Sequence, residues 1–309
     1  MISCTEFIPA YSTLFNYLEE KFGPQEVPHY WGLHFDPTKS ALYKYVSKEG
    51  IKGCFSYWTV TLNEEAADFT MYLDEKRGYY LLDMHHCPSK GRLLKLREEI
   101  GVEPYHGYCL HCDHYRAAIE ACGLKYLFNC VGADKASCSI LIYDPNKFDG
   151  RVIADENTLI MDRRASDNEY FHQSFHGSLN TGISYLEKTY GESHVRAYLE
   201  KFSNDFYRSI AEDAKVRGLV AIEEKILDTY KNEHALDAVQ TQLDDNTLTV
   251  TVSYCPAEKF LRSVGAKLSP LYYMSTSVVM ETLAKNAGLS FSFDSYDPST
   301  GAAKYRFMK

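Results

Sequence analysis

The sequence predicts an α+β protein made of two diverged copies of one unit, in which antiparallel sheets pack with helices. Two periodicities predict the elements, because apolar residues recur every three to four positions in some segments and alternate in others. A constant offset between similar segments predicts the duplication. The chain of 309 residues is 45% hydrophobic and 14% aromatic, which suffices for a sizeable core.

The repeat emerges when the chain is shifted by 168 residues against itself. The positions that then agree are Tyr17, Leu18, Glu19, Gly23, Val27, Gly50 and Cys87-Pro88 with Tyr185, Leu186, Glu187, Gly191, Val195, Gly218 and Cys255-Pro256. A deletion of three residues then aligns Tyr108 with Tyr273. The common order and spacing predict a first copy at residues 1–150 and a second at 151–309, with the boundary in the polar segment 144–155.

The positions of glycines and the spacing of apolar residues predict the helices. The first helix of each copy is expected to end at Gly23 or Gly191, where glycine can adopt the left-handed conformation. In the second copy, residues 167–229 are helical by pattern, with Asp167 or Asn168 as the cap at the start.

The strands are predicted by alternation and by turn residues. Residues 78–85 and 247–253 are expected to be strands, each followed by a Cys-Pro pair whose proline suits the opening turn of a helix. A hairpin ends each copy, formed by residues 124–129 with 137–143 and by residues 289–294 with 303–307. Residues 53–62 are expected to be an additional strand of the first copy only.

Composition restricts the function. The net charge of −9, without a basic tract, gives no attraction for nucleic acid. The first residues do not resemble a signal peptide, and no apolar run approaches the roughly 20 residues that span a bilayer, so we expect no membrane partner and a cytoplasmic location. The expected partner is a small-molecule substrate, and the sequence leaves a homo-oligomer open. Nine cysteines in such a chain are expected to be reduced thiols, some of them metal ligands or nucleophiles.

Chemistry is expected in the first copy. Both copies keep a cysteine at Cys87 and Cys255, which predicts packing, but only the first has the segment Tyr108-Cys-Leu-His-Cys-Asp-His114. The candidate ligands of zinc or another divalent metal are Cys109, Cys112, Cys130 and Cys138. Four sulfur ligands would make the metal structural, whereas an open position would make it catalytic. The alternative is that these are scattered reduced cysteines, and the choice stays open.

Histidines and one carboxylate add acid–base capacity. His111, Asp113 and His114 lie beside the thiols, and a Cys–His pair could make Cys112 or Cys109 a nucleophile. Tyr108 and His86 are candidate substrate contacts.

A second cluster begins the second copy. His172 and His176 are four residues apart, on one helical face, and are candidate proton-transfer groups. Arg163 and Arg164 are candidate partners of a substrate carboxylate. A solvated first helical turn is the alternative. As a further hypothesis, all four reach the pocket of the first copy.

The order of elements around Cys87-Pro88, the segment 108–113 and the hairpin with Gly132 and Cys138 resembles the L-2-amino-thiazoline-4-carboxylic acid hydrolase family. The second copy is similar through residues 250–256, but it has Met274 and Ser277 in place of the cysteines. The resemblance implies hydrolytic opening of a small ring at a carbon–nitrogen bond. The hairpin is also similar to the zinc-binding hairpin of 4-vinyl-reductase-type domains, which implies a metal and a buried pocket.

The sequence contains no dinucleotide fingerprint, phosphate-binding loop, serine-hydrolase elbow or kinase motifs. We therefore expect a metal-assisted hydrolase of small-molecule metabolism. The alternative is a non-enzymatic binding or sensor module with a structural zinc and a pocket lined by some of the 25 tyrosines.

Overall fold

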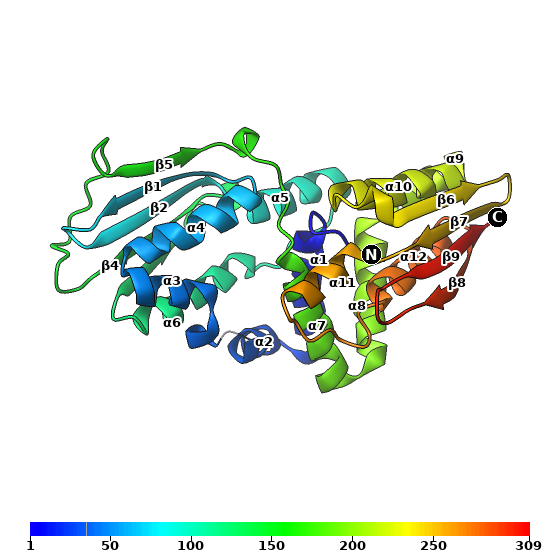
Figure 1. Ribbon diagram of the computed structural model, residues 1–309, viewed down its shortest axis with the longest axis horizontal. Coiled ribbons are helices and arrows are strands. Elements are labelled where there is room, and N and C mark those ends of the chain that lie inside the picture. The colour runs from blue at the N-terminus through cyan, green and yellow to red at the C-terminus, as the bar shows by residue number, and fades with distance from the viewer. Residues whose placement is uncertain (35) are drawn as a thin grey trace. The chain divides into compact units, whose positions relative to one another are not determined.

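The computed structural model describes residues 1–34 and 36–309, and it divides into two compact units (Figure 1). We name each unit after the cysteine that precedes its proline. The Cys87 unit consists of Leu18–Glu99 and Glu103–Tyr170, and the Cys255 unit consists of Met1–Tyr17, Ile100–Val102 and Phe171–Lys309. The first 17 residues thus belong with the C-terminal part of the chain, so the units do not coincide with residues 1–150 and 151–309.

An antiparallel five-stranded sheet, in the order β3-β4-β2-β1-β5, forms one layer of the Cys87 unit. Its strands are β1 (Asp68–Asp74), β2 (Tyr79–His86), β3 (Lys125–Asn129), β4 (Cys138–Tyr143) and β5 (Leu159–Arg163). The predicted strand at 78–85 and the predicted hairpin at 124–143 are therefore confirmed within one or two residues.

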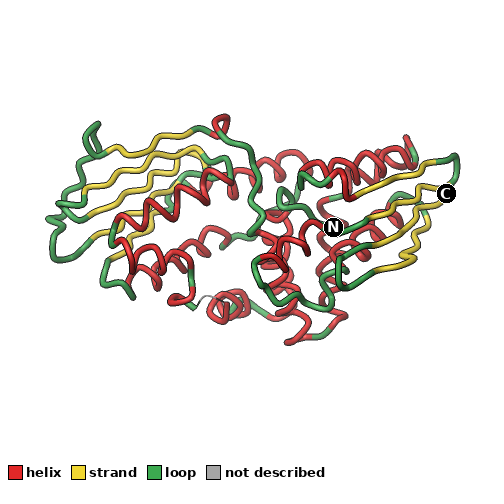
Figure 2. The backbone as a smooth tube through the Cα atoms, viewed as in Figure 1, coloured by secondary structure: helices red, strands yellow, loops and turns green. Residues whose placement is uncertain are grey.

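Helices cover this sheet (Figure 2). The helices of this unit are α2 (Glu26–His34), α3 (Ala41–Glu49), α4 (Lys52–Glu64), α5 (Pro88–Ile100, up to Glu99 in this unit) and α6 (Tyr115–Glu120). α4 packs on β1 and β2, and α6 packs on β3. As predicted, Pro88 opens a helix.

The prediction of a strand at residues 53–62 is wrong, because this segment is helix α4. Its aromatic and β-branched residues favour a strand locally. However, Cys54, Trp58 and Leu62 recur every four residues and are all buried in the core of the unit. Burying that stripe against the sheet overrides local propensity.

The sheet of the Cys255 unit has four antiparallel strands in the order β6-β7-β9-β8. The strands are β6 (Val239–Leu243), β7 (Thr247–Val252), β8 (Ser290–Tyr296) and β9 (Ala303–Met308). The predicted strand at 247–253 and the predicted terminal hairpin are confirmed.

Helices pack on this second sheet as well, with α10 against β6 and β7 and α12 against β8. The helices are α1 (Phe7–Phe22, up to Tyr17 in this unit), α7 (Phe175–Tyr190), α8 (Glu192–Phe206), α9 (Arg208–Arg217), α10 (Leu219–Asn232), α11 (Pro256–Ser263) and α12 (Met274–Asn286). α1 and α7 end before Gly23 and Gly191 as predicted, with φ of 96° and 92°.

The predicted helix start at Asp167 or Asn168 is wrong. A short 3-10 helix, Ala165–Asp167, lies there, and α7 begins only at Phe175. The carboxylate of Asp167 accepts a hydrogen bond from the backbone of Arg164 and so closes a local turn instead.

The two sheets share one topology. The order β3-β4-β2-β1 of the Cys87 unit corresponds to β8-β9-β7-β6 of the Cys255 unit, and all pairs are antiparallel. The glycines that separate α3 from α4 and α9 from α10 have nearly the same backbone, with φ 62° and ψ −144° at Gly50 and φ 69° and ψ −144° at Gly218. This match supports the duplication that the sequence suggests.

The predicted α+β class, with antiparallel sheets packed with helices, is confirmed. Among the helices described, none is long and apolar enough to cross a membrane.

Candidate functional site

The end of β2 and the start of α5 place Cys87 beside the hairpin turn of its unit. The backbone N–H of Cys87 donates to the carbonyl oxygen of Ala136 at 2.6 Å. Ala136 has a left-handed φ of 59°, so the turn folds back toward this cysteine. The strand end and the hairpin turn thus form one edge of the candidate site.

The predicted Cys/His segment forms a 3-10 helix, η2 (Tyr108–His114), next to this edge. The hydroxyl of Tyr126, on β3, donates to the carbonyl oxygen of Cys112 at 2.8 Å and holds η2 on the sheet. Cys112 Sγ lies 3.6 Å from Nε2 of His111, and Nδ1 of His111 is hydrogen-bonded to the carbonyl oxygen of Tyr108.

These contacts assign the tautomer of neutral His111. A carbonyl oxygen only accepts, so Nδ1 carries the proton and Nε2 is left as an acceptor for the thiol of Cys112. Burial lowers the pKa of His111, which favours this neutral form. The sequence expectation of a Cys–His pair is therefore matched by a pair with a defined direction of proton transfer.

The cysteines of the expected metal site lie near one another. Cys109, Cys112, Cys130 and Cys138 are close enough for the charge on one to raise the pKa of another. Burial is the larger cause, and it raises the pKa of Cys109 to about 11 and that of Cys112 to about 12. The thiols of Cys109 and Cys112 are therefore protonated near neutral pH.

These four cysteines are the metal ligands expected from the sequence. Among residues 1–34 and 36–309, no group of three or more histidine, cysteine, aspartate or glutamate side chains is placed to hold a metal ion. The expected zinc and its four sulfur ligands therefore stay a prediction.

Glu65 is a site residue that the sequence analysis missed. It follows α4, and its Oε2 accepts a hydrogen bond from the hydroxyl of Ser89, two residues after Cys87, at 3.4 Å. Burial raises the pKa of this carboxyl to about 7, although the neighbouring His111 and Ser89 act in the opposite direction. The offset of 168 residues pairs Glu65 with Glu233, so both repeats have a glutamate at this position. This identity is the sequence signal that could have pointed to Glu65.

Among the other predicted residues of the Cys87 unit, Tyr108 belongs to the Cys112–His111 contact through its carbonyl oxygen, whereas Asp113, His114 and His86 have other neighbours. Asp113 is paired with Arg116 at 2.7 Å, and the ring of His114 packs edge-on against Trp31 with centroids 5.2 Å apart. Tyr108 is buried, whereas His86 is exposed and its ring covers Gly91.

The two predicted substrate arginines also stand apart from it. Arg163 and Arg164 are exposed, and Arg164 is paired with Asp162 at 2.5 Å. Their role in holding a substrate carboxylate stays a prediction.

His172 and His176 belong to the other unit. Only His176 lies in a helix, because α7 begins at Phe175, so the prediction that both share one helical face is wrong. Both are buried, with 7% of His172 and 1% of His176 exposed, so the alternative of a solvated helical turn does not describe them. Nε2 of His176 lies 3.0 Å from Oε2 of Glu233, whose other oxygen accepts from the backbone N–H of Cys4 at 2.5 Å. Burial opposes ionisation of Glu233, but the combined effect of these hydrogen bonds is larger, so the pKa of Glu233 is lowered. A common pocket with His111 stays a hypothesis.

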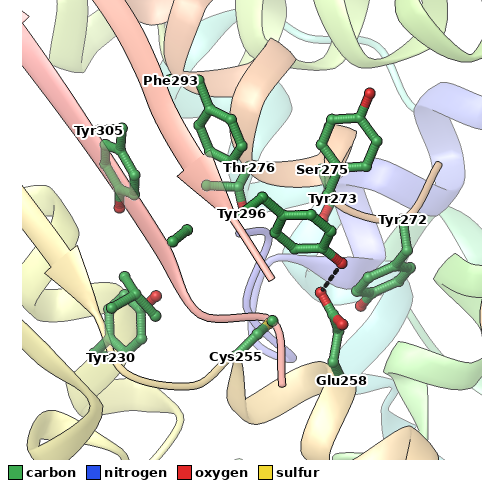
Figure 3. A pocket seen from close by; sticks show the side chains of 13 residues that line it. Tyr230, Cys255, Glu258, Tyr272, Tyr273, Ser275, Thr276, Phe293, Tyr296 and Tyr305 are labelled. Carbon is green, nitrogen blue, oxygen red and sulfur yellow. Dashed lines mark hydrogen bonds between the residues drawn. The ribbon is translucent and has the colours of Figure 1, made fainter. Parts of the chain in front are cut away.

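The Cys255 unit contains a pocket at the position that corresponds to the thiol cluster (Figure 3). Cys255 follows β7 as Cys87 follows β2, and its N–H donates to the hairpin carbonyl of Thr300 at 3.2 Å. Thr276, which the repeat aligns with His111, lines the pocket. The Cys255 unit, which was expected to be degenerate, thus has a pocket at the position where the Cys87 unit has the Cys–His pair.

Comparison with known proteins gives no match: no family model fits the sequence, and neither a curated protein nor a solved structure is significantly similar to it. The two family resemblances therefore stay predictions.

Proposed function

We propose that the chain hydrolyses a small cyclic substrate at a carbon–nitrogen bond, with Cys112 as the nucleophile and His111 as its base. The observation that carries the proposal is the 3.6 Å contact between Cys112 Sγ and the unprotonated Nε2 of His111. The pocket at the corresponding position of the Cys255 unit supports it, because related units tend to bind ligands in the same place.

The chemistry needs a base because the thiol is protonated at rest. As Sγ bonds to the ring carbon of a cyclic amide, its proton moves to Nε2 of His111. The carbon–nitrogen bond then breaks, its electron pair stays on nitrogen, and that nitrogen takes the proton from His111. Water attacks the resulting thioester and gives a proton to Nε2, and cleavage of the carbon–sulfur bond returns the thiol and releases a carboxylic acid.

Glu65 supplies a second acid–base group near this pair. With a pKa of about 7 it exists in both protonation states near neutrality, which is the range in which a proton-transfer group is most effective. Because its charge interacts with that of His111, we assign it to stabilising the protonated ring of His111 that forms during attack.

The test uses a panel of small cyclic amides and amidines, with mass spectrometry of the ring-opened products and of the intact protein. Wild type is expected to hydrolyse at least one compound and to accumulate an acyl group on Cys112. Cys112→Ser should lose both, and His111→Gln should slow turnover by about 10²–10⁴-fold. Cys122→Ser is the matched control, since this partly buried thiol lies outside the pair and should leave the rate unchanged.

A wild type that neither opens any compound nor becomes acylated would overturn the proposal. Elemental analysis separates the alternatives that involve a metal. Stoichiometric zinc that is lost in Cys112→Ser would replace the thiol mechanism, with a metal-assisted hydrolase if a ligand position is open and with a binding module if four sulfurs hold the metal.

A further inference from the structure

We propose that the pocket of the Cys255 unit binds a small primary amine in its ammonium form. This site is separate from the Cys–His pair and does not depend on the hydrolase proposal. It lies among the end of β7, the first turn of α11, the segment before α12 and the hairpin of β8 and β9 (Figure 3).

A buried hydroxyl without a partner points to a ligand. Tyr272 lines the pocket and is 1% exposed, and its OH has no hydrogen-bond partner within residues 1–34 and 36–309. Buried polar groups in proteins are nearly always paired, so an orphaned hydroxyl in a pocket wall is suited to a ligand group. In Figure 3 the Tyr272 hydroxyl points toward the side of the pocket that holds Glu258.

The polar groups around this hydroxyl are mostly acceptors. Glu258 is 2% exposed, its Oε1 accepts from the Tyr296 hydroxyl at 2.9 Å, and its Oε2 accepts from Arg262 at 2.9 Å. Tyr296 donates to Glu258 and so keeps its own lone pairs for another donor. An ammonium group has three N–H donors, which matches the number of side chains that offer it an oxygen, namely Tyr272, Tyr296 and Glu258.

The sign of the charge also favours a cation. None of the described residues that line the pocket is basic, and the one carboxyl among them is that of Glu258, which is paired with Arg262 outside the lining. An anionic ligand would therefore place its charge against a carboxylate in a partly dehydrated site, which is unfavourable.

Aromatic rings form the walls. They belong to Tyr230, Tyr272, Tyr273, Phe293, Tyr296 and Tyr305. The ring centroids of Tyr273 and Tyr296 are 5.2 Å apart, and those of Phe293 and Tyr305 are 6.1 Å apart. The faces of such rings attract cations, and cages of aromatic residues are a known means of binding ammonium groups.

The size of the space restricts the ligand. The cavity volume is about 10 Å³, close to what a single water molecule needs, and the pocket opens to solvent. An ammonium head is of that size, so the head fits the closed end while a short carbon chain extends toward the opening. Gly301 keeps the hairpin close, because a Cβ there would lie 2.5 Å from Cβ of Cys255.

The experiment is isothermal titration of the full chain with propylamine, 1-propanol and propionate, which share a carbon chain and differ in charge. Propylamine is expected to bind, and the alcohol and the acid to bind at least about tenfold more weakly, since a hydrogen bond to a charged group contributes that much. Equal binding of propylamine and 1-propanol, or binding of neither, would overturn the proposal.

Two variants locate the site. Tyr272→Phe should weaken propylamine binding by about tenfold while raising the melting temperature of the free protein, because it removes an unpaired buried hydroxyl. Tyr80→Phe is the matched control, since Tyr80 in the Cys87 unit also has a buried hydroxyl that lacks a partner among the described residues. It should leave propylamine affinity unchanged.

An unchanged affinity in Tyr272→Phe, or an equal loss in Tyr80→Phe, would also overturn the site. Cys112→Ser should bind propylamine like wild type. If the protein binds propylamine but has no hydrolase activity, the hydrolase proposal is therefore rejected and the amine site is retained.

Discussion

The unprotonated Nε2 of His111 faces the thiol of Cys112 at 3.6 Å, while Nδ1 of the same ring is held by the carbonyl oxygen of Tyr108. The backbone of η2 therefore sets the direction in which a proton can move. Because the half-buried thiol next to it is protonated near neutral pH, the proton moves to His111 only during attack, and the resting pair does not hold a thiolate.

Alkylation of Cys109 tests the protonation of the cluster. Burial raises its pKa to about 11, so the thiolate fraction increases about tenfold per pH unit between pH 7 and 10. The rate of iodoacetamide modification, followed by peptide mass spectrometry in the native protein, should rise in the same proportion. A rate that levels off near pH 8 would show an ordinary or activated thiol instead.

Glu65→Gln tests the buried carboxyl. The folded-state pKa of about 7 is above the ordinary glutamate value of 4.5, so the folded protein holds this proton more tightly than the unfolded chain. The resulting penalty is absent below pH 4.5, grows as the pH rises, and is complete above pH 7. Glu65→Gln should thus become more stable than wild type with rising pH, by up to about 3 kcal/mol.

Urea denaturation at pH 5 and pH 8 measures this difference. The same stability difference between variant and wild type at both pH values would contradict the assigned pKa.

Glu233→Ala tests the buried pair with His176. The two side chains are 0% and 1% exposed, so removing the carboxylate leaves His176 and the Cys4 N–H without their acceptor. We expect a loss of about 3–5 kcal/mol in the free energy of unfolding. Glu281→Ala removes an ion pair with Arg196 whose side chains are 53% and 46% exposed, and it should cost at most about 1 kcal/mol. Similar losses in the two variants would refute a structural role for the buried pair.

Gly50→Ala and Gly218→Ala test the matched corners of the two units. At φ of 62° and 69° an alanine is strained, and each change should cost about 1–3 kcal/mol in the free energy of unfolding. Gly177→Ala within α7 is the control, since no atom lies within 4 Å of its added Cβ and the helix should gain up to about 1 kcal/mol. Tolerance of alanine at one corner only would argue against equivalent corners.

Much of the fold was predictable because the relevant information is local. Pro88 and Pro256 open helices, Gly23 and Gly191 end them, and both terminal hairpins occur where turn residues separate alternating runs. The prediction of a strand at residues 53–62 failed because it used only local strand propensity. The burial of Trp58 and Leu62, which favours the helix, depends on a sheet formed by distant strands.

The site was predictable only in part. The sequence singled out His111 and Cys112 because several cysteines and histidines lie close together there. Glu65 belongs to no such motif, and its pKa is raised by the surrounding residues that exclude water from it. The pocket was missed for a related reason. Tyr272, Tyr296 and Glu258 come from three separate segments, and only folding brings their oxygens to one cavity.

By itself, then, the sequence determined the α+β class and the helix and strand ends marked by glycine and proline. The tertiary structure alone decided that residues 52–64 are helical, which histidine nitrogen faces the thiol, and that the Cys255 unit has a pocket. The physical reason is that periodicity and turn propensities act between neighbours in the chain, while burial, proton affinity and cavities arise from surroundings that distant segments supply.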